Sequence, residues 1–153
     1  MNRSACAAEC SFKKSRKLGT AMLLGLGVGA LLTNLWLKPA VFRPRPYTWD
    51  GSVFQQIWIT MGEHMESDYS FPSGHTASSF VAAFMMGRYI PKWGKCSYIL
   101  AVLIAVSRCH VGVHYPTDVL FGALSGVLIG LLVSFIFEKL LALLNKKLGK
   151  ELL

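Results

Sequence analysis

Charged residues are scarce in this sequence. Only 16% of its 153 residues are Asp, Glu, Lys or Arg, 53% are hydrophobic, and the mean hydropathy is +0.44. An ordinary soluble domain carries about 25% charged residues. A soluble helical bundle also needs a polar face on each helix, and the run "AMLLGLGVGALLTNLWL" at 21–37 has none. The composition therefore predicts a single integral membrane domain of the all-α class.

Cysteine is also rare, and carboxylates do not cluster. Of the four cysteines, only Cys109 is expected on the face opposite to the other three, so no disulfide is predicted. A metal pair at Cys6 and Cys10 has no nearby histidine, and no carboxylate cluster suits magnesium. The chain shows no internal repeat and no low-complexity linker. We therefore expect no cofactor.

Apolar residues concentrate in four segments. A helix needs about 20 residues to cross about 30 Å of hydrocarbon. The first and last segments reach that length, whereas the two between them are shorter, which implies helix ends recessed from the membrane surface. The sequence predicts an integral membrane helical bundle with about four transmembrane helices, at Leu18–Leu37, Ser73–Ile90, Cys96–Ser107 and Thr117–Phe137.

The net charge of +8 has a distribution that argues against nucleic acid as a partner. Twelve of the 16 basic residues precede the first apolar segment, separate the second from the third, or follow the fourth. The positive-inside rule then places both termini in the cytoplasm of a multi-pass cell membrane protein. Four cations remain on the outer side and need another explanation: Lys38, Arg43, Arg45 and Arg108.

These patterns divide the chain into three parts. Residues 1–17 form a basic cytoplasmic tail, residues 18–137 the membrane-embedded domain, and residues 138–153 a basic amphipathic tail on the inner surface. The first apolar run could be a signal peptide, but it is long for one, and we predict a retained anchor. Glycines repeating every four residues, at 122, 126 and 130, predict close packing between helices.

The polar residues of the outer side fall into three clusters. They are "KPAVFRPRP" at 38–46, "PSGH" at 72–75 and "SRCHVGVHYPTD" at 107–118. Each cluster adjoins the predicted outer end of an apolar helix, so residues distant in the sequence meet at one depth. Ionisable groups near a membrane are costly and indicate function. We predict one pocket at the outer ends of the helices, shared by Lys38, Arg45, His75, Arg108, His114 and Asp118.

This set of side chains matches phosphoryl transfer. Cations bind phosphate oxygens, and the start of a helix at "PSGH" presents free amide groups to an anion. His75 is placed to give a proton to a leaving oxygen. Asp118 can hold one ring nitrogen of His114 and leave the other as a nucleophile. The expected reaction passes through a phosphohistidine.

A zinc site is the sharpest alternative, because His110, His114 and Asp118 follow one another at intervals of four. Pro116 weakens it, since proline disfavours helical geometry at the preceding residue. Taken alone, His64 and His110 are interpreted as interfacial histidines and are left out of the site.

The three clusters together resemble the signature of the type 2 phosphatidic acid phosphatase and haloperoxidase superfamily. The sequence fits Lys, six residues, Arg-Pro; then Pro-Ser-Gly-His; then Ser-Arg, five residues, His, three residues, Asp, over about residues 38–135. The resemblance implies a helical fold, no metal requirement for the phosphatases, and catalysis by His114, His75 and Asp118. It also implies phosphate binding by Lys38, Arg45, Ser73, Gly74 and Arg108.

The resemblance implies a lipid phosphate as substrate, of the undecaprenyl diphosphate, phosphatidate or phosphatidylglycerol phosphate class. A vanadium-dependent haloperoxidase and an inactive membrane protein that retains the site are the alternatives. Membrane members usually have about six spanning helices, and this chain has one before the first motif where two or three are expected. A reduced form, a partner subunit such as a second copy of the chain, and an upstream start all remain open.

Overall fold

The computed structural model describes residues 3–63, 65–149 and 153, and within them the chain is all-α, as predicted. A long N-terminal helix passes into a π-helical segment and a short final turn, and three helices follow a polar connection. The elements are α1 (Arg3–Ala30), a π-helix (Leu31–Leu37), α2 (Lys38–Val41), a 3-10 turn (Pro46–Thr48), α3 (Val53–Thr60), α4 (Gly74–Tyr89), α5 (Pro91–His110) and α6 (Pro116–Leu148).

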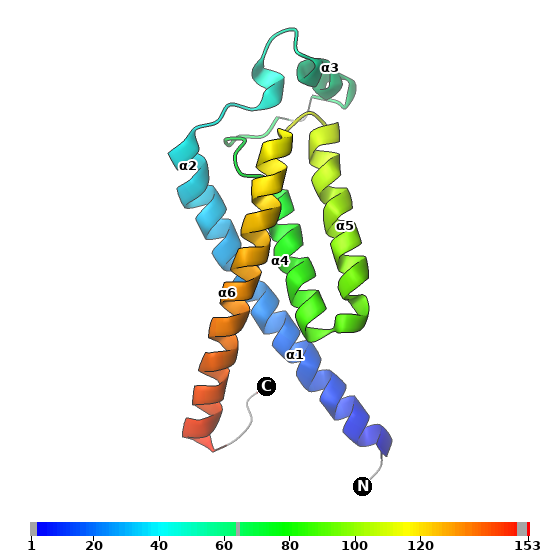
Figure 1. Cartoon of the computed structure of the whole chain (residues 1–153), viewed down its shortest axis with the longest axis vertical. Coiled ribbons are helices and arrows are strands. Elements are labelled where there is room, and N and C mark those ends of the chain that lie inside the picture. Colours follow the sequence, from blue (N-terminus) through cyan, green and yellow to red (C-terminus); the bar gives the residue numbers. More distant parts are fainter. Residues whose placement is uncertain (1–2, 64, 150–152) are drawn as a thin grey trace.

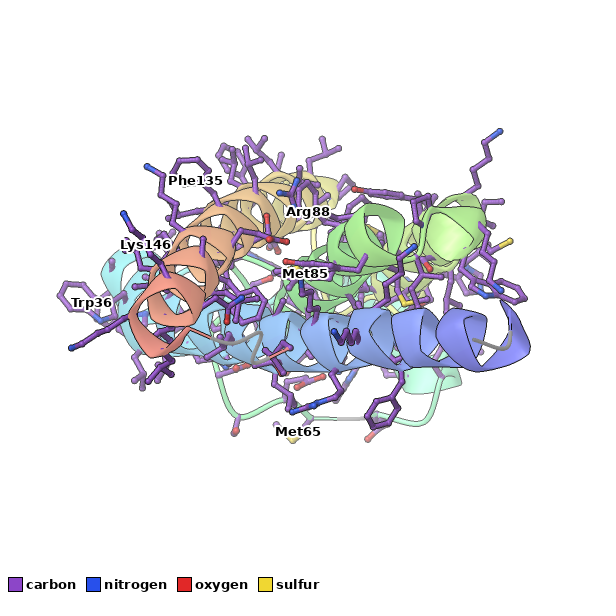
Figure 2. The ribbon with its side chains drawn as sticks, turned by 90° about the horizontal axis from the view of Figure 1, so that it is seen from below. Trp36, Met65, Met85, Arg88, Phe135 and Lys146 are labelled. Carbon is purple, nitrogen blue, oxygen red and sulfur yellow. The ribbon has the colours of Figure 1, made fainter. Side chains whose placement is uncertain are left out.

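Helix α4 is central to the bundle. It packs on α1, α5 and α6, and α1 crosses α6 at an angle (Figure 1). Viewed along the bundle, Met85 points in between the helices, whereas Trp36 and Phe135 point away from them (Figure 2). Side chains of α1, α4 and α6 make up the hydrophobic core, namely Ala21, Val81, Met85, Ile129, Val133, Phe137 and Leu141.

The glycines of α6 allow its close approach to α4, as predicted. Gly122 faces Ser73, Gly126 faces Ala77, and Gly130 faces Phe84. A Cβ atom at Gly122 would lie 2.8 Å from the carbonyl oxygen of Ser73. Only a residue without a side chain fits there, so this glycine fixes the distance between the first turns of α4 and α6.

Two helical stretches in the described residues are long and apolar enough to cross a membrane, Phe12–Thr48 and Pro116–Leu148, with mean hydropathies of 1.7 and 2.5. The predicted count of about four spans is therefore not confirmed. Helix α4 has 16 residues, short of the about 20 that a membrane crossing requires. Large apolar side chains are nevertheless exposed along α1, α5 and α6. Contiguous exposed apolar surface of this kind suits a lipid environment.

Helix boundaries differ from the predicted segments where polar residues belong to a helix. Helix α5 begins at Pro91, five residues before the predicted Cys96. The prediction started too late because the first residues of the helix, "PKWGK", are polar and lower the local hydropathy. Helix α1 already includes the described part of the basic tail 1–17, and α6 continues unbroken to Leu148. The sequence analysis did not predict α3, an eight-residue helix on the polar side of the bundle.

The two ends of the bundle differ in character. The start of α1 and the end of α6 lie at the lower end in Figure 1, and the connection from α4 to α5 lies above them, at the lower ends of those two helices. These are the segments that carry the predicted inner basic residues. Helix α3, the described residues of the segment 61–73 and the turn 111–115 lie at the upper end, which we call the site end (Figure 1).

Candidate active site

A pocket of about 540 Å³ opens at the site end of the bundle. Its lining residues come from the end of α1, the π-helix, α2, the first turns of α4, the second half of α5 and three connecting segments, which contribute Arg45, then Glu66 and Asp68, then His114. Five of the eight predicted site residues line it, namely Lys38, Arg45, Gly74, His75 and His114. The convergence of these distant motifs, predicted from their places at helix ends, is therefore present in the structure.

His114 is fully buried except where it meets the pocket. Its Nε2 atom lies 3.4 Å from the Arg45 guanidinium, and its Nδ1 atom lies 3.5 Å from the Asp118 carboxylate. Pro116 is the first residue of α6, where its missing amide and fixed φ are favourable, so His114 precedes the helix and Asp118 stands in its first turn. One ring nitrogen thus faces the carboxylate and the other faces the pocket.

Asp118 is held from several sides and is 0% exposed. Ser70 donates a hydrogen bond to one carboxylate oxygen, as does the amide of Tyr115 at 3.0 Å. The other oxygen accepts a hydrogen bond from Arg43 at 2.7 Å, and this guanidinium also lies 4.0 Å from the centre of the Tyr115 ring. A carboxylate with this many donors is held in one orientation and is kept ionised.

Lys38 and Arg45 are both buried, and both contact the carboxylate of Asp68. Lys38 contacts one Asp68 oxygen and Arg45 contacts the other. The Nε atom of Arg45 also donates to the Asp68 carbonyl oxygen at 2.9 Å, and its Nη1 atom donates to the Val113 carbonyl oxygen at 3.1 Å. The two cations are thereby oriented along one wall of the pocket.

Asp68 lies in the connection 61–73, outside the helices. Its partial burial by itself raises the pKa of the carboxyl group, but the hydrogen bonds and charges of Lys38 and Arg45 outweigh this and hold the pKa below its ordinary value. Asp68 is therefore ionised throughout the neutral range, and one carboxylate charge lies at the pocket in the absence of substrate.

The "PSGH" segment begins α4, as predicted, although the helix itself starts at Gly74. Ser73 is the N-cap, and its hydroxyl oxygen accepts from the amide of Thr76. The first amides of a helix have no partner within it. Gly74 and His75 carry the first two amides of α4, and both residues line the pocket. The exposed side chain of His75 lines the same pocket.

Three predicted site residues do not line the pocket. Asp118 lies behind His114, where its carboxylate faces Nδ1 of the ring. Ser73 is buried, and its amide donates to the Asp118 carbonyl oxygen at 3.1 Å, which joins α4 to α6. Arg108 is half-buried, and its guanidinium donates to the Ser107 hydroxyl at 3.4 Å. Burial lowers the pKa of His75, and the positive charge of Arg108 lowers it further. Phosphate binding stays a prediction for Ser73 and Arg108, as it does for Lys38, Arg45 and Gly74.

The remaining histidines are separate from this arrangement. His110 ends α5 and lines a smaller cavity of about 230 Å³ against α3. Within the described residues, His110, His114 and Asp118 do not form a group that could hold a metal ion. His64 lies outside the described residues.

Sequence reasoning missed three side chains of the site, Arg43, Asp68 and Ser70. Arg43 was counted among the outer cations and Asp68 is one of only eight acidic residues, but neither stands at a position that the three motifs define. The scarcity of charge was the available signal. In so apolar a chain, a charged residue on the predicted outer side that is not itself a motif residue is a candidate ion-pair partner for a charged motif residue.

Two curated proteins illustrate what this chain is similar to in sequence. The chain is 32% identical to an undecaprenyl-diphosphatase of Sulfolobus acidocaldarius over 75% of its own length and 53% of that protein's. It is 35% identical to the phosphatidylglycerophosphatase B of Bacillus subtilis over 80% of its own length and 59% of that protein's. The chain thus spans about half the length of the curated relatives it matches.

A solved structure is similar as well. The crystal structure of a transmembrane PAP2 type phosphatidylglycerolphosphate phosphatase from Bacillus subtilis superposes with a TM-score of 0.61 at 29% identity, over 90% of this chain and 71% of that one. Residues 17–141 match the sequence profile of the PAP2 superfamily, a stretch that contains all three motifs and the whole pocket. The chain is therefore a member of the PAP2 superfamily, with the all-helical fold that its sequence predicted.

Proposed function

We propose that this protein is a membrane phosphatase that hydrolyses the phosphate or diphosphate headgroup of a lipid. The observation that carries the proposal is the 3.4 Å separation between the Arg45 guanidinium and Nε2 of His114. A phosphate group held by Arg45 and Lys38 has its phosphorus within reach of that nitrogen. Its opposite ring nitrogen faces the buried Asp118 carboxylate, which suits the tautomer with a free electron pair on Nε2.

The residues support a two-step reaction. In the first step His114 Nε2 forms a bond to phosphorus, the bond from phosphorus to the leaving oxygen breaks, and His75 supplies the proton that this oxygen needs. In the second step water attacks the phosphohistidine, His75 accepts the proton of the water, and inorganic phosphate leaves. Lys38, Arg45 and the first amides of α4 stabilise the charge on the transferred group.

A lipid substrate follows from the position of the pocket. The same cavity is lined by cations and by apolar residues such as Ala30 and Ile104, and the helices α1 and α5, which carry these two apolar residues, expose other apolar side chains to their surroundings. The relatives named above act on undecaprenyl diphosphate and phosphatidylglycerophosphate. We infer a substrate of this class, or phosphatidate, with its headgroup among the cations and its chain in the membrane.

The test is phosphate release from lipid phosphates by the purified protein in detergent. We expect turnover that persists in excess EDTA and is inhibited by orthovanadate, because vanadate can adopt the five-coordinate geometry of the transition state. Loss of activity on chelation that zinc restores would contradict the metal-independent mechanism, and no release from any lipid phosphate would contradict the function. A panel of lipids compared by kcat/KM then identifies the preferred headgroup.

We further propose that the pocket faces outward, with both termini in the cytoplasm. The support is the separation of the basic segments from the site end of the bundle (Figure 1). Cys109 lies in the last turn of α5, next to Arg108, and Cys96 lies in the first half of the same helix. In intact cells, a small impermeant thiol reagent should label a variant that keeps only Cys109 and spare a matched variant that keeps only Cys96. The reverse pattern would place the active site in the cytoplasm.

A further inference from the structure

The carboxylate of Asp68 occupies the two cations that the proposed mechanism assigns to phosphate. One of its oxygens contacts Lys38 and the other contacts Arg45. The side chains of these cations are only 7% and 4% exposed, whereas that of Asp68 is 43% exposed. The carboxylate therefore stands between two buried cations and the open pocket.

A phosphate group would need the same contacts. Lys38 and Arg45 both line the cavity together with Asp68, and their charged atoms already face its carboxylate oxygens. Phosphate presents oxygens to guanidinium and ammonium groups in the same manner as a carboxylate does. Two anions cannot share one pair of donors without strong mutual repulsion.

No other acidic side chain described around the pocket is placed in this way. Asp118 is fully buried behind His114 and is already bound by Arg43, Ser70 and the amide of Tyr115. Glu66 reaches Arg45 only at 3.9 Å. Asp68 also comes from the connection 61–73 and not from a helix, so its side chain can leave the cations without a shift of α4 or α6.

We propose that Asp68 sets the affinity of the site for phosphate by competing with it for Lys38 and Arg45. This inference rests on the proposed phosphatase function of the same pocket. In the phosphate-free protein the carboxylate neutralises the two buried cations. An incoming phosphate group displaces it, and the carboxylate returns when inorganic phosphate departs, which limits retention of the product.

The competition gives Asp68 a role that differs from that of a phosphate ligand. Removing a ligand weakens phosphate binding, whereas removing a competitor strengthens it. Asp68→Asn keeps the shape of the side chain and removes its charge. Asp50→Asn is the matched control, because Asp50 is an exposed carboxylate that accepts a hydrogen bond from Gln55 and does not line the pocket.

The experiment measures binding of inorganic phosphate to the full chain in detergent by isothermal titration, without any hydrolysis. Loss of one carboxylate charge next to the bound anion should tighten phosphate binding by Asp68→Asn about tenfold. Asp50→Asn should bind phosphate as the unsubstituted protein does. Unchanged or weaker binding by Asp68→Asn would overturn the proposal, since Asp68 would then be neutral or would serve to orient the cations.

Stability provides the second measurement. Without its carboxylate partner, the pair of buried cations should lower the melting temperature of Asp68→Asn in phosphate-free buffer, and saturating phosphate should restore it. A variant that stays unfolded even in saturating phosphate would overturn the proposal, because phosphate could not then replace the carboxylate. Phosphate binding that follows these expectations without any lipid hydrolysis would refute the proposed function alone.

Discussion

The site has a buried side and an accessible side, and each holds its carboxylate in a different way. We call His114, with Asp118 behind it, the buried wall, and Asp68 with the two cations that it contacts, Lys38 and Arg45, the accessible wall. Asp118 belongs to a helix, is 0% exposed and has donors on every side, whereas Asp68 belongs to a connection and has a side chain that is 43% exposed. Each carboxylate pairs with arginine. Asp118 contacts Arg43 behind the site, and Asp68 contacts Arg45 within it.

The difference shows that surroundings, and not residue type, assign the role of a carboxylate. Removing the partners of a fully buried carboxylate such as Asp118 leaves an uncompensated buried charge and is costly, whereas an accessible carboxylate such as Asp68 can turn to solvent and leave its cations to another anion. The buried wall is therefore suited to hold the nucleophile in one geometry. The accessible wall is suited to give way to a substrate.

Asp118→Asn should break the buried wall and produce the largest effect. An amide in this place can donate to Nδ1 of His114 and favour the wrong tautomer, as well as remove the charge that stabilises the protonated ring. We expect kcat for phosphate release to fall by about 10³ to 10⁴. Binding of inorganic phosphate should change little, in contrast to Asp68→Asn. A loss of kcat below tenfold would show that Asp118 does not orient the nucleophile.

His75→Ala should have an effect that depends on the substrate, because His75 lies on the accessible side and acts on the leaving oxygen. For a lipid alkyl phosphate we expect kcat to fall by about 10² to 10³, since an alkoxide leaves only with a proton. For an activated aryl phosphate the loss should be about tenfold or less. His110→Ala, which changes a histidine outside the pocket, is the matched control. Equal losses for every leaving group would contradict the acid assignment.

Arg43→Ala should weaken the buried wall without removing its carboxylate. Arg43 donates to Asp118 and lies against the Tyr115 ring, and it does not line the pocket. Because Ser70 and the Tyr115 amide still hold the carboxylate, we expect about a tenfold loss of kcat with KM nearly unchanged. Arg16→Ala, at the opposite end of the bundle, should leave both parameters unchanged. An increase in KM alone would show that Arg43 contacts substrate instead.

The sequence predicted the buried wall better than the accessible one. His114 and Asp118 are only four residues apart, so their spacing in the sequence is enough to predict that their side chains come close together. The helical class followed from the apolar runs, and the meeting of three motifs followed from their places at helix ends. These inferences need only the length and direction of helices.

The partners of these residues could not be predicted because they depend on side-chain contacts across the fold. Asp68 meets Lys38 over 30 positions of sequence, and Arg43 meets Asp118 over 75. Both contacts depend on how the connecting segments that carry Arg43 and Asp68 are placed at the pocket, and no hydropathy pattern encodes that placement. Phe42 has a positive φ of 52°, which turns the chain at the end of α2 and brings Arg43 and Arg45 toward the site.

Gly122→Ala should perturb the buried wall through packing alone and is expected to have the smallest effect on turnover. The new Cβ atom would meet the Ser73 carbonyl oxygen at 2.8 Å, so α6 must shift away from α4. The neighbouring bond from the Ser73 amide to the Asp118 carbonyl oxygen would be strained by the same shift.

We expect a loss of about 1 to 3 kcal/mol in the free energy of unfolding, measured in detergent, and a decrease in kcat of a few-fold. Gly27→Ala is the matched control, because a Cβ atom there meets nothing within 4 Å. Alanine also favours a helix by up to about 1 kcal/mol over glycine, so this control should be neutral or stabilising. Phosphate affinity should stay constant in both variants, since neither alters Asp68 or its two cations. A change in phosphate affinity on Gly122→Ala would mean that the buried and the accessible wall move together. The distinction between a rigid buried wall and an accessible wall whose carboxylate phosphate displaces would then be wrong.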